Sequence, residues 1–220
     1  MASVYAPQDD IFQPNLYQAI DPMEFAYQMW PANMVRFYPK QEEIIYSVEN
    51  NDETIVHAGN MLGKDFVAGY IALSYFLRYP VVRIITTSIR DDHLRVLWAE
   101  IHRFIDTCRY PLLASQGGPL HLTHRSITKV RNGTKCPISY MRGMVSEKQE
   151  GLAGHHAPFT LAIMDEASGI PDEAYTQMQT WAKRILAIGN PMNCSNFFYR
   201  SYKQGNILDV SGLESDRSTK

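Results

Sequence analysis

The stretch Ala58-Gly59-Asn60-Met61-Leu62-Gly63-Lys64-Asp65 decides the fold, because it joins a short apolar run to a long one. Residues 54–57 have the composition of a buried strand, and residues 66–77 are apolar over the length of a helix. A glycine-containing loop between a strand and a helix is the context that a phosphate-binding loop needs. Its glycines let backbone N–H groups turn toward phosphate oxygens, the helix N-terminus adds its positive dipole, and the lysine neutralises phosphate charge.

Two positions depart from the usual pattern of such loops. Ala58 stands where the first glycine usually lies, which is tolerable if φ stays below zero there. Asp65 stands where Ser or Thr normally gives a hydroxyl to Mg²⁺, and a carboxylate can also hold that ion, directly or through water. Because Asp65 adds negative charge beside the phosphates, we expect weakened nucleotide affinity or slow turnover. Taken alone, a Gly-Lys pair after a strand is more often ordinary loop chemistry.

A second motif supports the first. The apolar run at residues 159–164 ends in two adjacent carboxylates, Asp165 and Glu166. This pattern is typical of a Walker-B strand, where Asp165 would help to hold the Mg²⁺ that bridges the β- and γ-phosphates and Glu166 would polarise the attacking water as general base. The alternative is a helix cap, with Asp165 or Ser168 at the start of the next helix.

The rest of the chain alternates between helical and extended patterns, which predicts a mainly parallel central sheet flanked by helices. About one hundred residues separate Lys64 from Asp165, leaving room for a strand at residues 81–87 between the two motifs. That is the arrangement of the additional-strand (ASCE) class of P-loop NTPases. The other expected elements are helices at residues 23–30, 41–49, 91–106 and 172–182, and a strand at residues 184–188.

An antiparallel β ribbon is expected near residues 120–142. Residues 120–130 and 137–141 are rich in strand formers and flank Asn132-Gly133, and Asn-Gly is a strong short hairpin signal.

Composition predicts one domain, because 220 residues with 45% apolar content can bury one full core but hardly two. We expect an N-terminal arm (residues 1–35), a core (36–204) and a C-terminal tail (205–220). The three cysteines show no metal-ligand spacing and no disulfide framework, which favours a reducing, cytosolic setting. The longest apolar stretch, residues 66–77, is too short to span a bilayer, so no membrane is expected.

The charges are unevenly distributed although the net charge is only −2. Residues 78–148 carry twelve Lys and Arg against five Asp and Glu, whereas residues 1–77 carry three against ten. The middle third could present one positive face to a phosphate backbone, or its charges could simply solvate helix surfaces.

A third polar stretch, Gly189-Asn190-Pro191, follows the strand expected at residues 184–188. Ligands of open α/β sheets lie at such carboxyl ends, so Asn190 could contact the γ-phosphate or the attacking water. Plain turn chemistry is the alternative and is favoured for this stretch alone.

Together these stretches resemble the large subunit of viral terminases of tailed bacteriophages, in its N-terminal DNA-packaging ATPase domain. The stretches are Tyr38-Pro-Lys-Gln41, the loop ending in Gly63-Lys64, Met164-Asp-Glu-Ala167 and Gly189-Asn-Pro191, in the order and spacing of that family over roughly residues 36–203. The resemblance implies that Gln41 reads the adenine edge and that Tyr38 stacks nearby. It also implies that the loop from Gly59 to Asp65, with Asn60, Met61, Leu62, Gly63 and Lys64, binds ATP with Mg²⁺.

The family also has a segment like Tyr140-Met-Arg142-Gly143, followed by residues 150–157, before its acidic pair. Arg142 is therefore the candidate arginine finger, which would reach the ATP of a neighbouring subunit. Pairing with Glu147 or Glu150 is the alternative. Similarity also suggests that the helix carrying Arg90, Arg95 and Arg103 faces DNA or a subunit interface.

The function implied by this resemblance is an ATPase motor that couples ATP hydrolysis to translocation of double-stranded DNA into a procapsid, in the host cell cytoplasm. The implied partners are the portal protein and procapsid, the terminase small subunit and further copies in a ring of five. Large subunits ordinarily continue into a nuclease domain, whereas residues 213–220 are a polar tail, so no nuclease activity is expected. The alternatives are a nucleotide-binding assembly module with blunted hydrolysis and a helicase-like translocase.

Overall fold

The central feature of the computed structural model is an eight-stranded sheet, built within the residues that the structure describes: 20–59, 62–146, 151–191, 195–201 and 207–210. The strands are β1 (Glu53–Ala58), β2 (Val82–Ser88), β3 (Leu120–Thr123), β4 (Ser126–Arg131), β5 (Thr134–Val145), β6 (Phe159–Asp165), β7 (Arg184–Gly189) and β8 (Ile207–Val210). The helices are α2 (Pro22–Met29), α3 (Pro39–Asn50), α4 (Lys64–Arg78), α5 (Asp91–Thr107), α6 (Asp172–Gln179) and α7 (Phe197–Ser201), with the 3₁₀ turns η1 (Ala114–Gln116) and η3 (Ala167–Gly169).

The strand order, β3-β4-β5-β2-β6-β7-β1-β8, confirms the predicted fold class. The pairs from β5 through β8 are parallel, and the β3-β4-β5 end is antiparallel. The strand predicted between the two motifs along the chain, β2, lies on the far side of β6 in the sheet. The strand between β1 and β6 is β7, which follows both of them in sequence.

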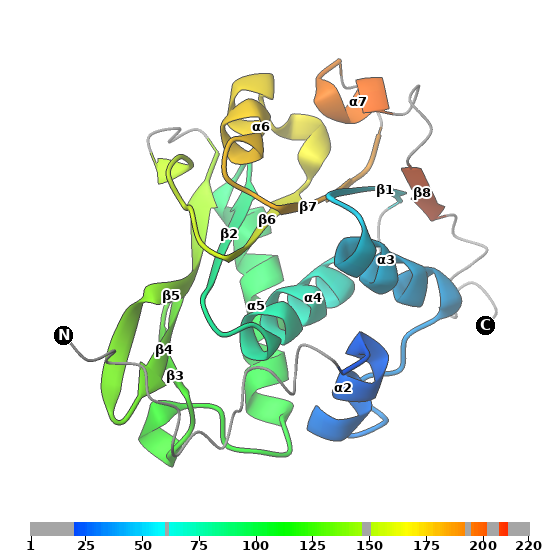
Figure 1. Cartoon of the computed structure of the whole chain (residues 1–220). Helices are drawn as coiled ribbons and strands as arrows, with labels where there is room; N and C mark the ends of the chain where they lie inside the picture. Colours follow the sequence, from blue (N-terminus) through cyan, green and yellow to red (C-terminus); the bar gives the residue numbers. More distant parts are fainter. Residues whose placement is uncertain (1–19, 60–61, 147–150, 192–194, 202–206, 211–220) are drawn as a thin grey trace.

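Helices cover both faces of the parallel strands (Figure 1). On one face lie α4 and α5, with α2 and α3 packed beside them. Every residue of α4 from Val67 to Arg78 is buried, as expected for a helix that is apolar on all sides. The other face carries η3, α6 and α7, whose apolar side chains form a second core cluster with β6 and β7.

Residues 20–35 are part of the core, although the sequence suggested that residues 1–35 form an arm. The helix α2 begins at Pro22 behind the N-cap Asp21, whose carboxylate accepts hydrogen bonds from two backbone N–H groups. Trp30 is fully buried, and its indole Nε1 donates to the backbone carbonyl of Phe104 at 2.7 Å. Aromatic residues without a strand period act here as anchors against α4 and α5. Residues 1–19 lie outside the described part of the chain.

The expected hairpin is present and is longer than predicted. Asn132 and Gly133 both have positive φ, 49° and 73°, as a two-residue hairpin turn requires. The stretch predicted as one strand at residues 120–130 is divided into β3 and β4 by a turn. Pro137 lies in β5 where the register with β4 shifts, and before the parallel pairing with β2 begins at Tyr140. Its missing N–H therefore removes no hydrogen bond from that parallel pair.

The C-terminal part contains two elements that the sequence did not indicate. The strand β8 pairs with β1 in parallel, within the segment expected to be a tail. The short helix α7 packs Phe198 onto the sheet, and α6 ends at Gln179, three residues earlier than predicted. Cys108 and Cys136 are free thiols, and Cys194 lies outside the described residues. Over the described ranges, no helix has both the length and the apolarity needed to cross a bilayer.

Replacing Trp30 with alanine tests whether the N-terminal segment belongs to the core. Loss of a fully buried indole leaves a cavity and removes the bond to Phe104, so we expect the free energy of unfolding to fall by about 3–5 kcal/mol. Tyr27, three residues earlier and on α2, is 52% exposed. Tyr27→Ala is the control and should change stability by less than about 0.5 kcal/mol. Urea unfolding followed by circular dichroism measures both, and equal effects of the two changes would contradict the assignment.

Candidate active site

Three neighbouring strands bring the chemically active residues to one edge of the sheet. The strands β6, β7 and β1 are parallel and adjacent, so their carboxyl ends meet at the same edge. Lys64 follows β1 through the loop, Asp165 is the last residue of β6, and Asn190 directly follows β7. The glycine that ends β7, Gly189, has no room for a side chain, because a Cβ there would lie 2.9 Å from the backbone nitrogen of Ala167. The backbone at the end of β7 therefore packs directly against the backbone that follows β6, at Glu166 and Ala167.

Lys64 and Glu166 form an ion pair across this edge. The ammonium belongs to the first residue of α4 and is buried, with 8% of Lys64 exposed. The carboxylate lies just beyond the end of β6, on the partly buried side chain of Glu166. The pair joins the two predicted motifs directly, which their separation by about one hundred residues in sequence does not by itself ensure.

The backbone at Glu166 is left-handed, with φ 50° and ψ 48°. A residue other than glycine adopts this conformation at a cost of about 1–3 kcal/mol, and such residues concentrate at functional sites. Here the sharp turn ends the strand immediately after Asp165. It separates the two carboxylates, so that Asp165 stays beneath the edge while Glu166 reaches Lys64.

Asp165 is the most deeply buried acid of the site, with 1% of its surface exposed. Neither carboxylate oxygen accepts a hydrogen bond from the described part of the chain. Burial, reinforced by the negative charges of Asp65 and Glu166, raises the pKa of Asp165 to about 8, although Lys64 opposes the rise. A buried carboxyl without a partner is costly to ionise unless a cation or water satisfies it.

These acids fit a divalent cation such as Mg²⁺. Asp65, in the first turn of α4, lies near enough to Asp165 to raise its pKa, and burial raises the pKa of Asp65 itself. Both are hard oxygen donors. Among the described residues there is no group of three His, Cys, Asp or Glu arranged to hold a metal. A site of one or two carboxylates is typical of Mg²⁺ that takes its other ligands from water and nucleotide phosphates.

The backbone of the loop requires glycine at its end, at Gly63, but not at its start, at Gly59. Gly63 has φ 72°, and a Cβ on it would lie 2.8 Å from Nε2 of Gln41. At Gly59, φ is not left-handed, and a Cβ would meet Leu62 at 3.6 Å, an ordinary contact. Only the second glycine is therefore required by the backbone. The predicted contacts of Asn60 and Met61 lie outside the described residues.

Tyr38 and Gln41 hold the loop from the start of α3. The hydroxyl of Tyr38 donates to the carbonyl of Leu62 at 2.7 Å, and the amide of Gln41 donates to the carbonyl of Gly63 at 3.3 Å. Gln41 is almost fully buried. Sequence reasoning assigned both residues to adenine, which stays a prediction. The sequence did not predict their hydrogen bonds to the loop, because the spacing of residues along the chain gives no signal for a contact between a side chain and a loop carbonyl.

Arg142 lies away from the carboxyl edge of its own chain. It pairs in register with Ile85 of β2, which in turn pairs with Ala162 of β6, three residues before Asp165. Its exposed guanidinium stacks 4.2 Å from the ring centroid of Tyr140. Its role as a finger therefore stays a prediction, and it would act on another molecule. The alternative partners Glu147 and Glu150 lie outside the described residues.

The sequence reasoning assigned no role to Tyr140, whose ring contacts the guanidinium groups of both Arg142 and Arg83. Arg83 approaches the same ring, 5.2 Å from the centroid, and the phenol oxygen lies 2.7 Å from Nδ1 of His155. Burial lowers the pKa of His155, and the nearby Arg142 and Arg83 lower it further, while a hydrogen bond to Gly151 opposes the shift.

The arginines of α5 and its N-cap residue Arg90 are exposed and paired with nearby acids. The ion pairs are Arg90 with Asp92, Arg95 with Asp91 and Arg103 with Glu100. Such exposed pairs contribute little stability, about 0–1 kcal/mol. With its N-cap Arg90, this helix carries three arginines against four acids, so it has no net positive charge. The prediction that it faces DNA or a subunit interface is untested.

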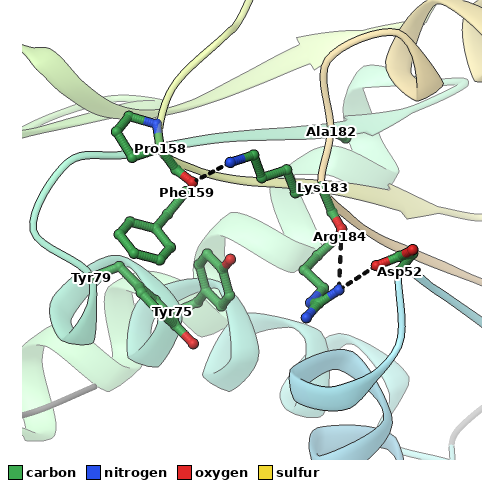
Figure 2. A pocket seen from close by; sticks show the side chains of 8 residues that line it. All are labelled: Asp52, Tyr75, Tyr79, Pro158, Phe159, Ala182, Lys183 and Arg184. Carbon is green, nitrogen blue, oxygen red and sulfur yellow. Dashed lines mark hydrogen bonds and ion pairs between the residues drawn. The ribbon is translucent and has the colours of Figure 1, made fainter. Parts of the chain in front are cut away.

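A separate cavity of about 470 Å³ opens at the other end of the sheet (Figure 2). Its lining comes from the amino ends of β6 and β7 and the last turns of α4, with the rings of Tyr75, Tyr79 and Phe159 facing Lys183 and Arg184. Arg184 pairs there with Asp52 at 2.6 Å. This cavity is remote from Lys64 and Asp165, which lie at the carboxyl ends of the strands, and it is not the phosphate site.

Comparison with known proteins agrees with the fold. No family model matches the chain. It is 28% identical over 177 residues to the "Probable terminase, large subunit" of Enterobacteria phage P7, a match that covers 74% of this chain and 34% of that protein. The chain thus spans about a third of the length of this relative.

Two solved structures share the fold. A mutant ATPase domain of the large terminase of Thermus phage P74-26 aligns with a TM-score of 0.58 at 12% identity, over 78% of this chain and 81% of that one. A large terminase of a thermophilic bacteriophage in complex with ATP-γ-S aligns with a TM-score of 0.50 at 14% identity, over 80% of this chain and 44% of that one. The chain is thus similar in sequence to a phage large terminase and shares the fold of a large terminase ATPase domain.

Replacing Gly63 with alanine tests the conformation of the loop. A side chain at φ 72° is strained, and its Cβ would displace the amide of Gln41, so we expect the free energy of unfolding to fall by about 1–3 kcal/mol. Gly59→Ala is the matched control, because its Cβ has space. Thermal unfolding of the nucleotide-free chain measures the difference. Equal stability of the two variants would show that the loop conformation described here is wrong.

Proposed function

We propose that this chain is the ATP-hydrolysing motor domain of a phage large terminase, coupling ATP hydrolysis to the movement of double-stranded DNA into a procapsid. The observation that carries the proposal is the meeting of Lys64, Asp165 and Glu166 at one sheet edge. Because the chain is similar to a phage large terminase, the proposed partners are the portal protein, the procapsid, the terminase small subunit and four further copies in a five-membered ring. The proposed setting is the host cell cytoplasm.

In this proposal the triphosphate lies against the loop that ends in Gly63, at the N-terminus of α4. Backbone N–H groups of this helix end and the ammonium of Lys64 bind the β- and γ-phosphate oxygens. Asp165 and Asp65 hold Mg²⁺, which when bound supplies positive charge to the same phosphates. Tyr38 and Gln41 position the loop and border the adenine, and the loop residues Gly59, Asn60, Met61 and Leu62 complete the cradle.

Glu166 is the proposed general base. Its carboxylate is paired with the ammonium of Lys64. Phosphate oxygens compete for that ammonium, so binding of ATP frees the carboxylate to accept a proton from the attacking water. The water oxygen then bonds to the γ-phosphorus as the bond to the β,γ-bridging oxygen breaks, which yields ADP and phosphate. Asn190 contacts the γ-phosphate or the water, and Arg142 stabilises the transferring phosphoryl group of a neighbouring copy.

Two substitutions test the catalytic assignment. Glu166→Gln keeps the size of the side chain but cannot take a proton, so the rate of phosphate release should fall by about 10²–10⁴-fold while ATP binding is retained. Lys64→Ala should weaken ATP binding as well. The controls are Glu173→Gln, at an exposed carboxylate on α6, and Lys183→Ala, at an exposed lysine just before the amino end of β7. Fluorescent ATP binding and phosphate release measure the two effects, and unchanged turnover in Glu166→Gln would refute the assignment.

The second candidate is an assembly module that binds nucleotide with blunted hydrolysis. Asp65 favours it, because a third carboxylate beside Asp165 and Glu166 adds negative charge where phosphates must bind.

Replacing Asp65 with threonine separates the two candidates. The change restores the usual hydroxyl and removes one charge, so the blunted module predicts a large gain in Mg·ATP affinity, on the order of tenfold, and little phosphate release from the unmodified chain. The motor predicts measurable release from the unmodified chain and little gain from the substitution. Calorimetric titration with Mg·ATP, alongside a phosphate-release assay, measures both quantities.

A further inference from the structure

The carboxyl edge of β2 adds a fourth oxygen group to the site. Ser88, the last residue of β2, is fully buried, and its hydroxyl has no hydrogen-bond partner within the described ranges. Asp165, the last residue of β6, has the same two properties. Buried polar groups nearly always have partners, so unpartnered groups at the ends of β2 and β6 indicate a ligand or water near them.

The sheet register makes Ser88 and Asp165 neighbours. The strands β2 and β6 pair in parallel up to Thr87 and Met164, so the next residues along each strand are Ser88 and Asp165. Adjacent strands lie about 4.8 Å apart. The two side chains leave neighbouring backbones at the same level of the sheet.

The two side chains also leave the sheet on the same face. Along β2, Thr86 accepts a hydrogen bond from Trp98 of α5, and Ser88 shares its face because side chains alternate along a strand. Along β6, Ile163 packs in the core cluster that includes α4 and α5, and Asp165 shares its face. Both groups therefore point to the side of the sheet on which α4 begins with Lys64.

We infer that the hydroxyl of Ser88 and the carboxylate of Asp165 share one water, and that this water belongs to the coordination sphere of the divalent cation when nucleotide is bound. A bridging water satisfies both buried groups, which form no direct hydrogen bond. Ser88 is then a positioning residue that supplies a hydroxyl to a site whose loop carries Asp65 in place of Ser or Thr. This inference rests on the proposed function.

Binding of Mn²⁺ in the presence of ADP tests the inference without requiring turnover. In the unmodified chain, electron paramagnetic resonance of free Mn²⁺ gives the dissociation constant of the cation in the ADP complex. Ser88→Ala should raise that constant about tenfold, as loss of groups that orient metal ligands does, and leave ADP affinity without divalent cations unchanged. Ser88→Thr keeps the hydroxyl and should bind Mn²⁺ within about twofold of the unmodified chain.

Thr87→Val is the matched control. Thr87 is equally buried and its hydroxyl also lacks a partner within the described ranges, but it lies on the opposite face of β2, with Ile85. It should leave Mn²⁺ binding unchanged. Ser88→Cys, which keeps the volume but is a poor hydrogen-bonding group, should behave like Ser88→Ala and serves as the test if the alanine variant does not fold.

The outcomes separate this inference from the proposed function. Mn²⁺ affinity that is unchanged in Ser88→Ala or Ser88→Cys, or equally weakened in Thr87→Val, overturns the role of Ser88 and leaves the nucleotide site standing. An unmodified chain that binds neither ADP nor Mn²⁺ overturns the proposed function and the role of Ser88 with it.

Discussion

Three carboxylates crowd around one ammonium at the carboxyl edge of the sheet, and the arrangement of the site depends on this imbalance. Lys64 pairs with Glu166, while the buried Asp165 and the half-buried Asp65 lie nearby and have raised pKa values. Negative charge in excess within a buried region is unfavourable unless a cation neutralises it. The excess therefore makes a divalent cation a natural component of this edge, and together with burial it raises the pKa of Asp165.

The sheet makes this crowding possible because its register and turns leave little freedom at the edge. The strand β7 lies between β1 and β6 and so fixes the spacing between the loop that carries Lys64 and the acidic pair that follows β6. The close approach of Gly189 and the left-handed backbone of Glu166 then turn the chain sharply after Asp165. On the other side, Gln41 and Tyr38 hold the carbonyls of the loop. Strain at Glu166 and unpaired oxygens at Asp165 are tolerated because core packing beneath the edge determines the positions of both residues.

The sequence predicted the parallel core and the meeting of the two motifs, because both rest on strong local patterns: long apolar runs, Gly63-Lys64 and Asp165-Glu166. It did not predict that residues 20–35 join the core or that β8 extends the sheet, since short segments gain their structure from tertiary packing rather than from periodicity. The contributions of Ser88 and Tyr140 were also hidden. A serine at a strand end and a tyrosine on an edge ribbon acquire their roles from cross-strand register, which no local pattern encodes.

The position of Arg142 follows from the same register. The strand β2 separates β5 from β6, and Arg142 of β5 is level with Ala162 of β6. Arg142 therefore lies three residues short of the carboxyl end of β6, where Asp165 is found. Stacking on Tyr140 keeps it extended on the surface, and the hydrogen bond between Tyr140 and His155 fixes that ring. An exposed, pre-oriented guanidinium loses less conformational entropy when it binds an anion than a free side chain does. The fold thus places Lys64 inside the site and leaves the guanidinium of Arg142 exposed on the surface.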